Sequence, residues 1–445
     1  MQQETSPITS GPTQPRSFGS DIISVFSSNV FTLISNLLIV ILLSRKLGPE
    51  GYGLYTAVLV VPLLVVSFFQ MGIRPSTVFM IGSGRYNADQ VVSAVISTLF
   101  VTGTAGMVFS AITYLLMFKT GYTALLIILA LFTIPMRLTA IYAGGVFLAK
   151  EQIKKANIMN WLTALLMLVF AVVFVWLLKM KVTGALTGLL ISNVIVSAYA
   201  VSLLKKEYKI TINLRNPIII QMLRLGVVYA SSFLIIQLNY RVDILLLQRL
   251  SDTKEVGLYS LGVAFAELLW QIPLAISIIV MTRSANTKNM KLMTENTAKL
   301  LRLSIIAGIV LSAFIYLLAP YIIPLAFGPG FKASVAIIQT ILPGIIILII
   351  FRILSGQLSG MGKPQVALRA FIPALILNVA LNIILIPKMG GIGAAISTNI
   401  SYLAGTIIYV IAFCKITNTT VAHLFHYSAN DFSFIKNFIQ DRLKH

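Results

Sequence analysis

The chain contains an internal repeat, in which the second half follows the same order of features as the first. Residues 47–55 (LGPEGYGLY) separate two apolar runs, and residues 250–259 (LSDTKEVGLY) do the same in the second half. Pro135 and Pro343 occupy matching places, and residues 179–185 correspond to 387–394. Membrane proteins built from two similar halves commonly bind a substrate between them, because one half rocks against the other. The repeat therefore predicts a transporter.

The composition of the 445 residues is typical of a polytopic membrane protein. Hydrophobic residues make up 58% and charged residues only 11%, with a mean hydropathy of +0.92. A soluble domain of this composition lacks the polar surface to cover its core. The formal net charge is +21, but the cations are scattered over short loops. They form no basic stripe, so we expect no nucleic-acid partner.

We predict an all-α fold of about twelve transmembrane helices in two six-helix bundles, because apolar runs of about 20 residues recur along the chain. The predicted spans are 21–44, 53–71, 90–117, 122–148, 157–178, 183–204, 220–247, 257–280, 298–319, 333–358, 366–386 and 391–414. The expected parts are a disordered tail (1–19), an N-lobe (20–204), a cytoplasmic linker (205–219), a C-lobe (220–414) and a cytoplasmic amphipathic tail (415–445).

The distribution of cations predicts the orientation of the chain. Of the 34 Lys and Arg, nine fall in the odd-numbered loops and two, Arg137 and Arg241, deep within spans, which leaves 23 in the tails, the even-numbered loops and the span ends that adjoin them. Cytoplasmic loops carry the excess of Lys and Arg. We therefore expect a multi-pass protein of the cytoplasmic membrane with both termini inside.

Cysteine and histidine are too few for several kinds of site. The single cysteine, Cys414, excludes an intrachain disulfide, and all three histidines follow residue 420. We expect no cofactor and no metal, and no histidine-centred active site in the membrane part. After Cys414, Phe432, Ile435 and Phe438 fall near one helical stripe, which indicates either a helix on the inner leaflet or a disordered tail.

Charged residues within the predicted spans mark candidate functional positions. An ionised side chain at mid-bilayer costs about 2.5–3.5 kcal/mol on insertion scales. Arg137 lies near the middle of the fourth span and needs either an acidic partner or water; we favour a water-filled cavity. Arg74 and Arg352 lie nearer the cytoplasmic helix ends, where they either extend to the interface or face the cavity.

The acidic residues leave two interpretations open. Glu267 either pairs with Arg241 on a neighbouring helix or is a protonatable ion-coupling site. Asp243 is a second ion-coupling candidate, or a partner for a cation on another helix. It does not face Arg241, because residues two apart on a helix point in different directions.

The sign of the charges predicts the class of substrate. A cavity holding Arg74, Arg137, Arg241 and Arg352 against two acids is cationic and suits a phosphate-bearing anion. Amides at cavity-facing positions bind sugar hydroxyls, although such residues also join helices, at about 0.6 kcal/mol each. The amide candidates are Asn29 and Asn36 on one face of the first span, Gln237 on the face of Arg241, and Asn378 and Asn382 on the eleventh span.

Several of these segments together resemble a known family. Residues 44–55 (SRKLGPEGYGLY), 72–75 (GIRP) and Asp243 with the later 257–259 (GLY) resemble polysaccharide-biosynthesis flippases. These form the O-antigen-flippase-like branch of the multidrug/oligosaccharidyl-lipid/polysaccharide (MOP) exporter superfamily, and the resemblance covers roughly residues 20–414.

The resemblance implies two bundles in a V around a central cavity. It also implies alternating-access transfer of a polyprenyl (di)phosphate-linked oligosaccharide from the inner to the outer leaflet. The lipid bilayer and this lipid-linked oligosaccharide are the expected partners, with a glycan polymerase or glycosyltransferases as further ones. Cavity arginines of the family imply a phosphate-binding role for Arg74, Arg137 and Arg241.

Two other functions compete with this one. A multidrug or cation exporter of the same superfamily would need acidic residues deep in the cavity. A membrane enzyme acting on lipid-linked sugar would need catalytic carboxylates or histidines, commonly on sizeable outer loops. The outer loops are short, and their acids are Glu50, Asp252 and Glu255. We therefore expect a transporter that is not an enzyme.

Overall fold

The computed structural model describes residues 18–82, 86–116, 122–287 and 289–428, which form helices joined by short connections. The α-helices are α1 (Phe18–Phe69), α2 (Ile73–Gly82), α3 (Ala88–Leu116), α4 (Ala124–Ala149), α5 (Ile153–Ala171), α6 (Lys181–Glu207), α7 (Pro217–Leu250), α8 (Thr253–Ala266), α9 (Gln271–Asn286), α10 (Met290–Phe327), α11 (Ser334–Gly360), α12 (Gln365–Thr417) and α13 (Val421–Phe425). A π-helical turn, η1 (Val172–Leu177), and two 3₁₀ turns, η2 (Glu267–Trp270) and η3 (Pro329–Phe331), complete the chain. The predicted all-α class is confirmed.

Nine helical stretches within the described residues are long and apolar enough to cross a membrane. Two of them supply two passes each, because α1 bends at Gly48 (φ 68°) and α12 bends at Gly390 (φ 53°). Both bends fall between predicted spans, at glycines, which adopt positive φ without steric cost. With α7, each of the twelve predicted spans falls on a helix. The multi-pass prediction is confirmed.

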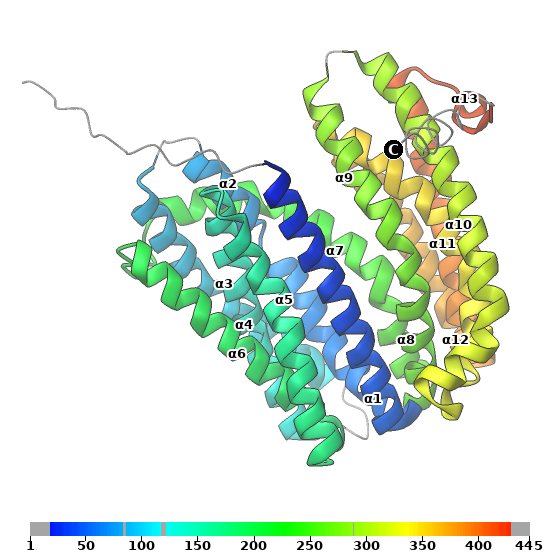
Figure 1. Ribbon diagram of the computed structural model, residues 1–445, viewed down its shortest axis with the longest axis horizontal. Helices are drawn as coiled ribbons and strands as arrows, with labels where there is room; N and C mark the ends of the chain where they lie inside the picture. The colour runs from blue at the N-terminus through cyan, green and yellow to red at the C-terminus, as the bar shows by residue number, and fades with distance from the viewer. Residues whose placement is uncertain (1–17, 83–85, 117–121, 288, 429–445) are drawn as a thin grey trace, which may run out of the picture.

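The helices form two groups that diverge in a V (Figure 1). In one group α4 packs on α3 and α6, and α1 packs on α5. In the other group α11 packs on α9, α10 and α12. The two groups correspond to the two halves of the repeat. The predicted amphipathic stripe at Phe432, Ile435 and Phe438, and the tail before Phe18, lie outside the described residues.

The connection between the halves is fixed to the first of them. Backbone N–H groups of Lys209, Thr211 and Asn213 donate to side chains of α3, on Asp89, Ser93 and Ser97 respectively. A Cβ on Gly226 of α7 would lie 1.6 Å from the carbonyl oxygen of Met71. The first turns of α7 therefore contact the first half, and α7 also packs on α12 of the second half.

The two halves meet at matching glycines of the repeat. A Cβ on Gly53 would lie 1.9 Å from the carbonyl oxygen of Thr253, and one on Gly257 would lie 1.9 Å from that of Pro49. Each glycine thus lets its helix touch the backbone of the other half. We call this contact the glycine contact; it closes the V at the end where α1 bends.

A second set of contacts reinforces this closed end. Nε of Arg45 donates to the carbonyl oxygen of Ala326 at 2.7 Å, and its Nη2 donates to that of Leu325. The guanidinium thus satisfies free carbonyls in the last turn of α10, where the helix dipole favours a cation. Tyr52 and Phe331 pack edge to face, with ring centroids 6.0 Å apart.

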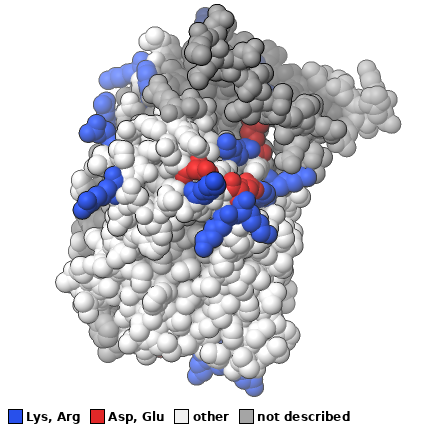
Figure 2. All heavy atoms as spheres, turned by 90° about the vertical axis from the view of Figure 1, so that its left-hand side faces the viewer, with Lys and Arg blue, Asp and Glu red and all other residues white. Residues whose placement is uncertain are grey.

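A broad band on one face of the molecule shows no charged side chain. Figure 2 shows Lys, Arg and acidic side chains on the upper part of one face and a few cations at the lower edge, with only uncharged residues between them. Exposed apolar side chains such as Phe109, Ile112 and Leu115 lie on the helices of the first half. This is the pattern of a surface that faces lipid.

Candidate functional site

A polar pocket of about 440 Å³ lies within the first half of the molecule. Its volume is in the range of small-ligand sites, roughly 300–1,000 Å³. It is lined by residues of α1, α2, α4, α5 and α6, and the charged ones are Arg74 and Arg137. Among the described residues that line it, none is acidic, so the pocket carries two positive charges.

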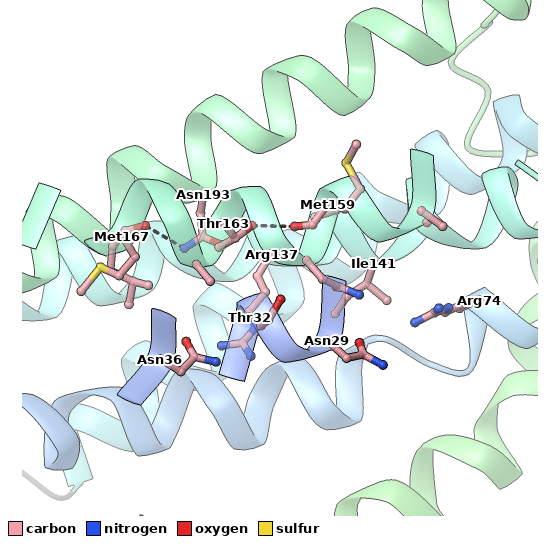
Figure 3. Close-up of a pocket in the computed structure, with 16 residues that line it drawn as sticks. Asn29, Thr32, Asn36, Arg74, Arg137, Ile141, Met159, Thr163, Met167 and Asn193 are labelled. Carbon is pink, nitrogen blue, oxygen red and sulfur yellow. Dashed lines mark hydrogen bonds between the residues drawn. The ribbon is translucent and has the colours of Figure 1, made fainter. Parts of the chain in front are cut away.

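Arg137 lies at the middle of the pocket (Figure 3). It comes from the middle of α4, yet its side chain is exposed because it faces the pocket. Among the described residues, none forms an ion pair or hydrogen bond with its guanidinium. Arg74 lies at the other end of the pocket from Asn36, and it also has no such partner among them. Both arginines therefore have free donors directed at the pocket.

Amides and hydroxyls surround these guanidinium groups. The described polar residues of the lining are Asn29, Thr32, Asn36, Asn160, Thr163 and Asn193. Asn193 donates to the carbonyl oxygen of Leu189 (2.7 Å) and Thr163 to that of Met159 (2.7 Å), so part of their capacity is used within their own helices. Asn29, Asn36 and Asn160 are exposed to the pocket. The lining can bind an anion and the hydroxyl groups next to it.

Arg241 and Glu267 do not line this pocket but form an ion pair in the second half. Nη2 of Arg241 lies 3.0 Å from Oε2 of Glu267, and their side chains are 26% and 19% exposed. Glu267 is the first residue of the 3₁₀ turn η2. The helix is irregular here because Pro273 has no backbone N–H to donate to the carbonyl oxygen of Leu269. Two interpretations were open for Glu267, and the structure shows one of them, the ion pair with Arg241.

Asp243 is buried in a network of neutral donors. Tyr259 and Thr398 both donate to its Oδ2 at 2.7 Å, and Asn382 donates to its Oδ1 at 2.6 Å. The carboxylate is only 1% exposed, and no cation of the described residues lies within ion-pair distance. Asn378 accepts a further hydrogen bond from Asn382 at 2.9 Å. The two amides of the eleventh span therefore belong to the Asp243 network rather than to the pocket.

The remaining predicted residues lie apart from the pocket. Gln237 of α7 donates to the hydroxyl of Ser67 on α1 at 3.3 Å. Arg352 of α11 stacks on Tyr240 and Trp270, with its Cζ 5.2 and 5.1 Å from their ring centroids. It does not line the polar pocket. Of the seven substrate-binding candidates, Asn29, Asn36, Arg74 and Arg137 lie together.

Sequence reasoning missed several pocket residues. Thr32 lies between Asn29 and Asn36 at spacings of three and four, which places all three on one helix face. Asn160 and Thr163 carry the same signal on α5, three residues apart. Asn193 carries no comparable signal, because it is a single amide in a long apolar helix.

Comparisons with known proteins agree with this architecture. A family model described as polysaccharide biosynthesis protein matches residues 18–282, and a second model, MatE, matches residues 229–384. The capsular polysaccharide biosynthesis protein CapF of Staphylococcus aureus is 22% identical over 408 residues, which are 88% of this chain and 98% of CapF.

Two solved structures share the fold. The lipid II flippase MurJ in an inward closed conformation superposes with a TM-score of 0.75 at 16% identity, covering 94% of this chain and 95% of MurJ. An inward-facing multidrug resistance MATE family transporter of the MOP superfamily gives a TM-score of 0.72 at 18% identity, covering 92% of this chain and 99% of the transporter. The chain therefore has the fold of these two proteins. Since the first family model spans more than half of the chain, the protein belongs to the polysaccharide biosynthesis protein family.

Proposed function

We propose that the protein is a flippase that moves a polyprenyl (di)phosphate-linked oligosaccharide from the inner to the outer leaflet by alternating access. The observation that carries the proposal is the pocket around Arg137, which has two unpaired guanidinium groups, several amides and no acid among its described lining residues. Guanidinium groups match phosphate oxygens in geometry and keep their charge. The amides are suited to the sugar hydroxyls that follow the phosphate.

The mechanism follows from the two ends of the V. The glycine contact and Arg45 hold one end closed, while the pocket lies within the first half. We propose that the closed end is the outer one and that both termini are cytoplasmic, in the cytoplasmic membrane. The headgroup enters the pocket, the lipid tail stays in the bilayer, and the lobes rock to open the outer end. The lobes are residues 20–204 and 220–414.

The polysaccharide family and CapF support glycan-related cargo, and MurJ is itself called a lipid II flippase. We further propose that a glycan polymerase or glycosyltransferases act with the protein, and that it is not an enzyme. The competing function is multidrug or cation export. The similarity to the MATE family transporter, taken alone, is equally consistent with that function. The charge of the pocket favours the flippase, because two arginines repel a cationic drug.

Asp243 is the proposed coupling group, with Glu267 as the second candidate. Asp243 has three neutral donors and, among the described residues, no cationic partner, so a proton or a small cation changes its charge without breaking an ion pair. Glu267 already has Arg241. We expect Asp243→Asn to abolish the dependence of transport on the ion or pH gradient, while Glu267→Gln leaves that dependence in place.

The Asp243→Asn and Glu267→Gln variants are compared by gradient-driven transport in vesicles that contain equal amounts of each protein. A gradient response that disappears in Glu267→Gln and persists in Asp243→Asn would reverse the assignment. Substrate binding is the internal control, since the proposal leaves the Arg137 pocket unchanged in both variants.

The flippase proposal itself is tested in vesicles containing a labelled polyprenyl diphosphate-linked oligosaccharide. The expected result is protein-dependent movement of the label between leaflets, with no accumulation of a cationic dye. Dye accumulation without lipid movement would instead establish the exporter.

A further inference from the structure

A second pocket, of about 210 Å³, lies between the two lobes and adjoins the Arg137 pocket. Asn36 of α1 lines both pockets, and in Figure 3 it lies at the end of the Arg137 pocket that is away from Arg74. The other walls of the second pocket come from α8, η2, α9 and α10. We call it the inter-lobe pocket. Unlike the Arg137 pocket, it is formed by both halves of the repeat.

The inter-lobe pocket lies next to the closed end of the V. Val40 of its lining comes five residues before Arg45 on α1. Phe327, also in the lining, directly follows Ala326, whose carbonyl oxygen accepts a hydrogen bond from Nε of Arg45 at 2.7 Å. A headgroup that is held at Arg137 and extends past Asn36 therefore reaches the space just inside the closed end.

The lining of the inter-lobe pocket is mostly apolar. Its apolar members are Leu33, Leu37, Val40, Leu261, Ala264, Phe265, Leu268 and Phe327. Its polar members are Asn36, Glu267 and Gln271, which come from both lobes. A concave apolar surface with a few convergent polar groups is the usual composition of a small-ligand site. The pocket is therefore suited to one small polar group that also carries an apolar part.

The polar side chains of the second lobe offer both an acceptor and a donor. Oε2 of Glu267 accepts from Arg241 at 3.0 Å, whereas no described residue donates to its Oε1. The amide of Gln271 is exposed and makes no hydrogen bond with a described residue. An ionised carboxylate only accepts hydrogen bonds, whereas a side-chain amide also donates them. The pocket thus presents an unused acceptor and an unused donor beside an apolar wall.

We propose that the inter-lobe pocket binds the acetamido group of an N-acetylated sugar in the cargo. The acetamido N–H donates to Glu267, its carbonyl oxygen accepts from Gln271, and its methyl group packs on the apolar wall. A sugar hydroxyl at this place lacks the methyl group, and it satisfies fewer of the polar groups that the sugar desolvates. The proposal rests on the flippase function for the nature of the cargo, and it adds which sugar is preferred.

Two soluble analogues of the cargo test this preference directly. Geranyl diphosphate linked to N-acetylglucosamine and geranyl diphosphate linked to glucose differ in the acetamido group alone. Each is titrated into the purified full-length protein, and the affinity is measured by isothermal titration calorimetry. We expect the N-acetylglucosamine compound to bind about tenfold more tightly, because it makes two additional hydrogen bonds, one of them to a charged group.

Substitutions at Gln271 assign the preference to this pocket. Gln271→Leu removes the donor, and Gln271→Glu keeps the length of the side chain but replaces the donor with an acceptor; both should abolish the tenfold preference. Gln365→Leu is the matched control, because Gln365 is an exposed glutamine of the same lobe that lines no described pocket. Glu267→Gln keeps an oxygen acceptor at its position, so that variant should bind the N-acetylated compound nearly as the parent protein does.

The same titrations separate this inference from the flippase proposal. Arg137→Ala should weaken both compounds equally and leave their ratio unchanged, because it acts on the diphosphate. Equal binding of the two sugars by the parent protein would overturn the acetamido site, even if lipid transport were demonstrated. Conversely, a measured preference without lipid movement in vesicles would reject the flippase and keep the site.

The lipid tail is the competing occupant of an apolar pocket between the lobes. Farnesyl diphosphate-linked N-acetylglucosamine, which has a longer tail than the geranyl compound, distinguishes the two. We expect Gln271→Leu to weaken the geranyl and farnesyl compounds by the same factor. An affinity that rises with the length of the tail and does not respond to the acetamido group would assign the pocket to the tail and contradict the proposal.

Discussion

Arg137→Ala is expected to reduce glycan export about 100-fold while the protein still inserts and folds. The substitution removes a guanidinium that lies in the middle of the pocket without any described partner. A bidentate charge-assisted contact with phosphate contributes about 3 kcal/mol, which corresponds to about 100-fold in affinity. The measurement is leaflet-resolved transport of labelled lipid-linked oligosaccharide, normalised to the amount of folded protein.

Two further variants make the result specific. Arg137→Lys keeps the charge but loses the planar fork, so an intermediate loss is expected. Arg369→Ala removes an exposed arginine that lines no described pocket, and it should transport normally. Normal export by Arg137→Ala at normal expression would falsify the phosphate-binding role of this residue.

Gly53→Val and Gly257→Val are each expected to open the closed end of the V and to reduce transport about tenfold or more. Neither position has room for a Cβ, which would lie 1.9 Å from a backbone oxygen of the opposite half. Relieving such an overlap costs about 1–3 kcal/mol, enough to displace a balanced conformational equilibrium. Because the two glycines are matching positions of the repeat, the two variants should behave alike.

Spin labels on the two halves measure this opening. In a Cys414→Ser background, labels at Leu178→Cys and Lys332→Cys should show a longer distance in the glycine variants than in the parent protein. Gly82→Ala is the matched control, because nothing lies within 4 Å of its added Cβ. Unchanged distances in Gly53→Val would show that the glycine contact does not hold the end closed.

The sequence predicted the membrane fold well because apolar length is a strong local signal. Twelve runs of about 20 residues are enough to place the helices. It did not predict that Gly48 and Gly390 would join neighbouring spans into bent helices, because a turn and a bend at glycine look alike in sequence. The helix α2 was also missed, since it is short and lies within a predicted loop.

The site was predictable only in part. Arg137 was found because an arginine in mid-span needs a physical reason, and Asn29 and Asn36 because they share a helix face. The grouping of side chains from different helices depends on packing that one sequence does not contain. The pairing of Arg241 with Glu267 and the isolation of Asp243 from cations are of this kind. So is the position of Arg352, which stacks on aromatic rings instead of facing the pocket.

We expect the Arg137 pocket to be filled with water and positively charged. Its most direct test is the labelling of a single cysteine at Thr163, in the pocket, in a Cys414→Ser background. The control is Val310→Cys, which is 61% exposed on the apolar surface of α10. The pocket cysteine should react with a charged, membrane-impermeant thiol reagent, faster with the anionic than with the cationic form, and a polyprenyl diphosphate should protect it. A pocket cysteine that is as unreactive as the one at position 310, or that prefers the cationic reagent, would contradict the account.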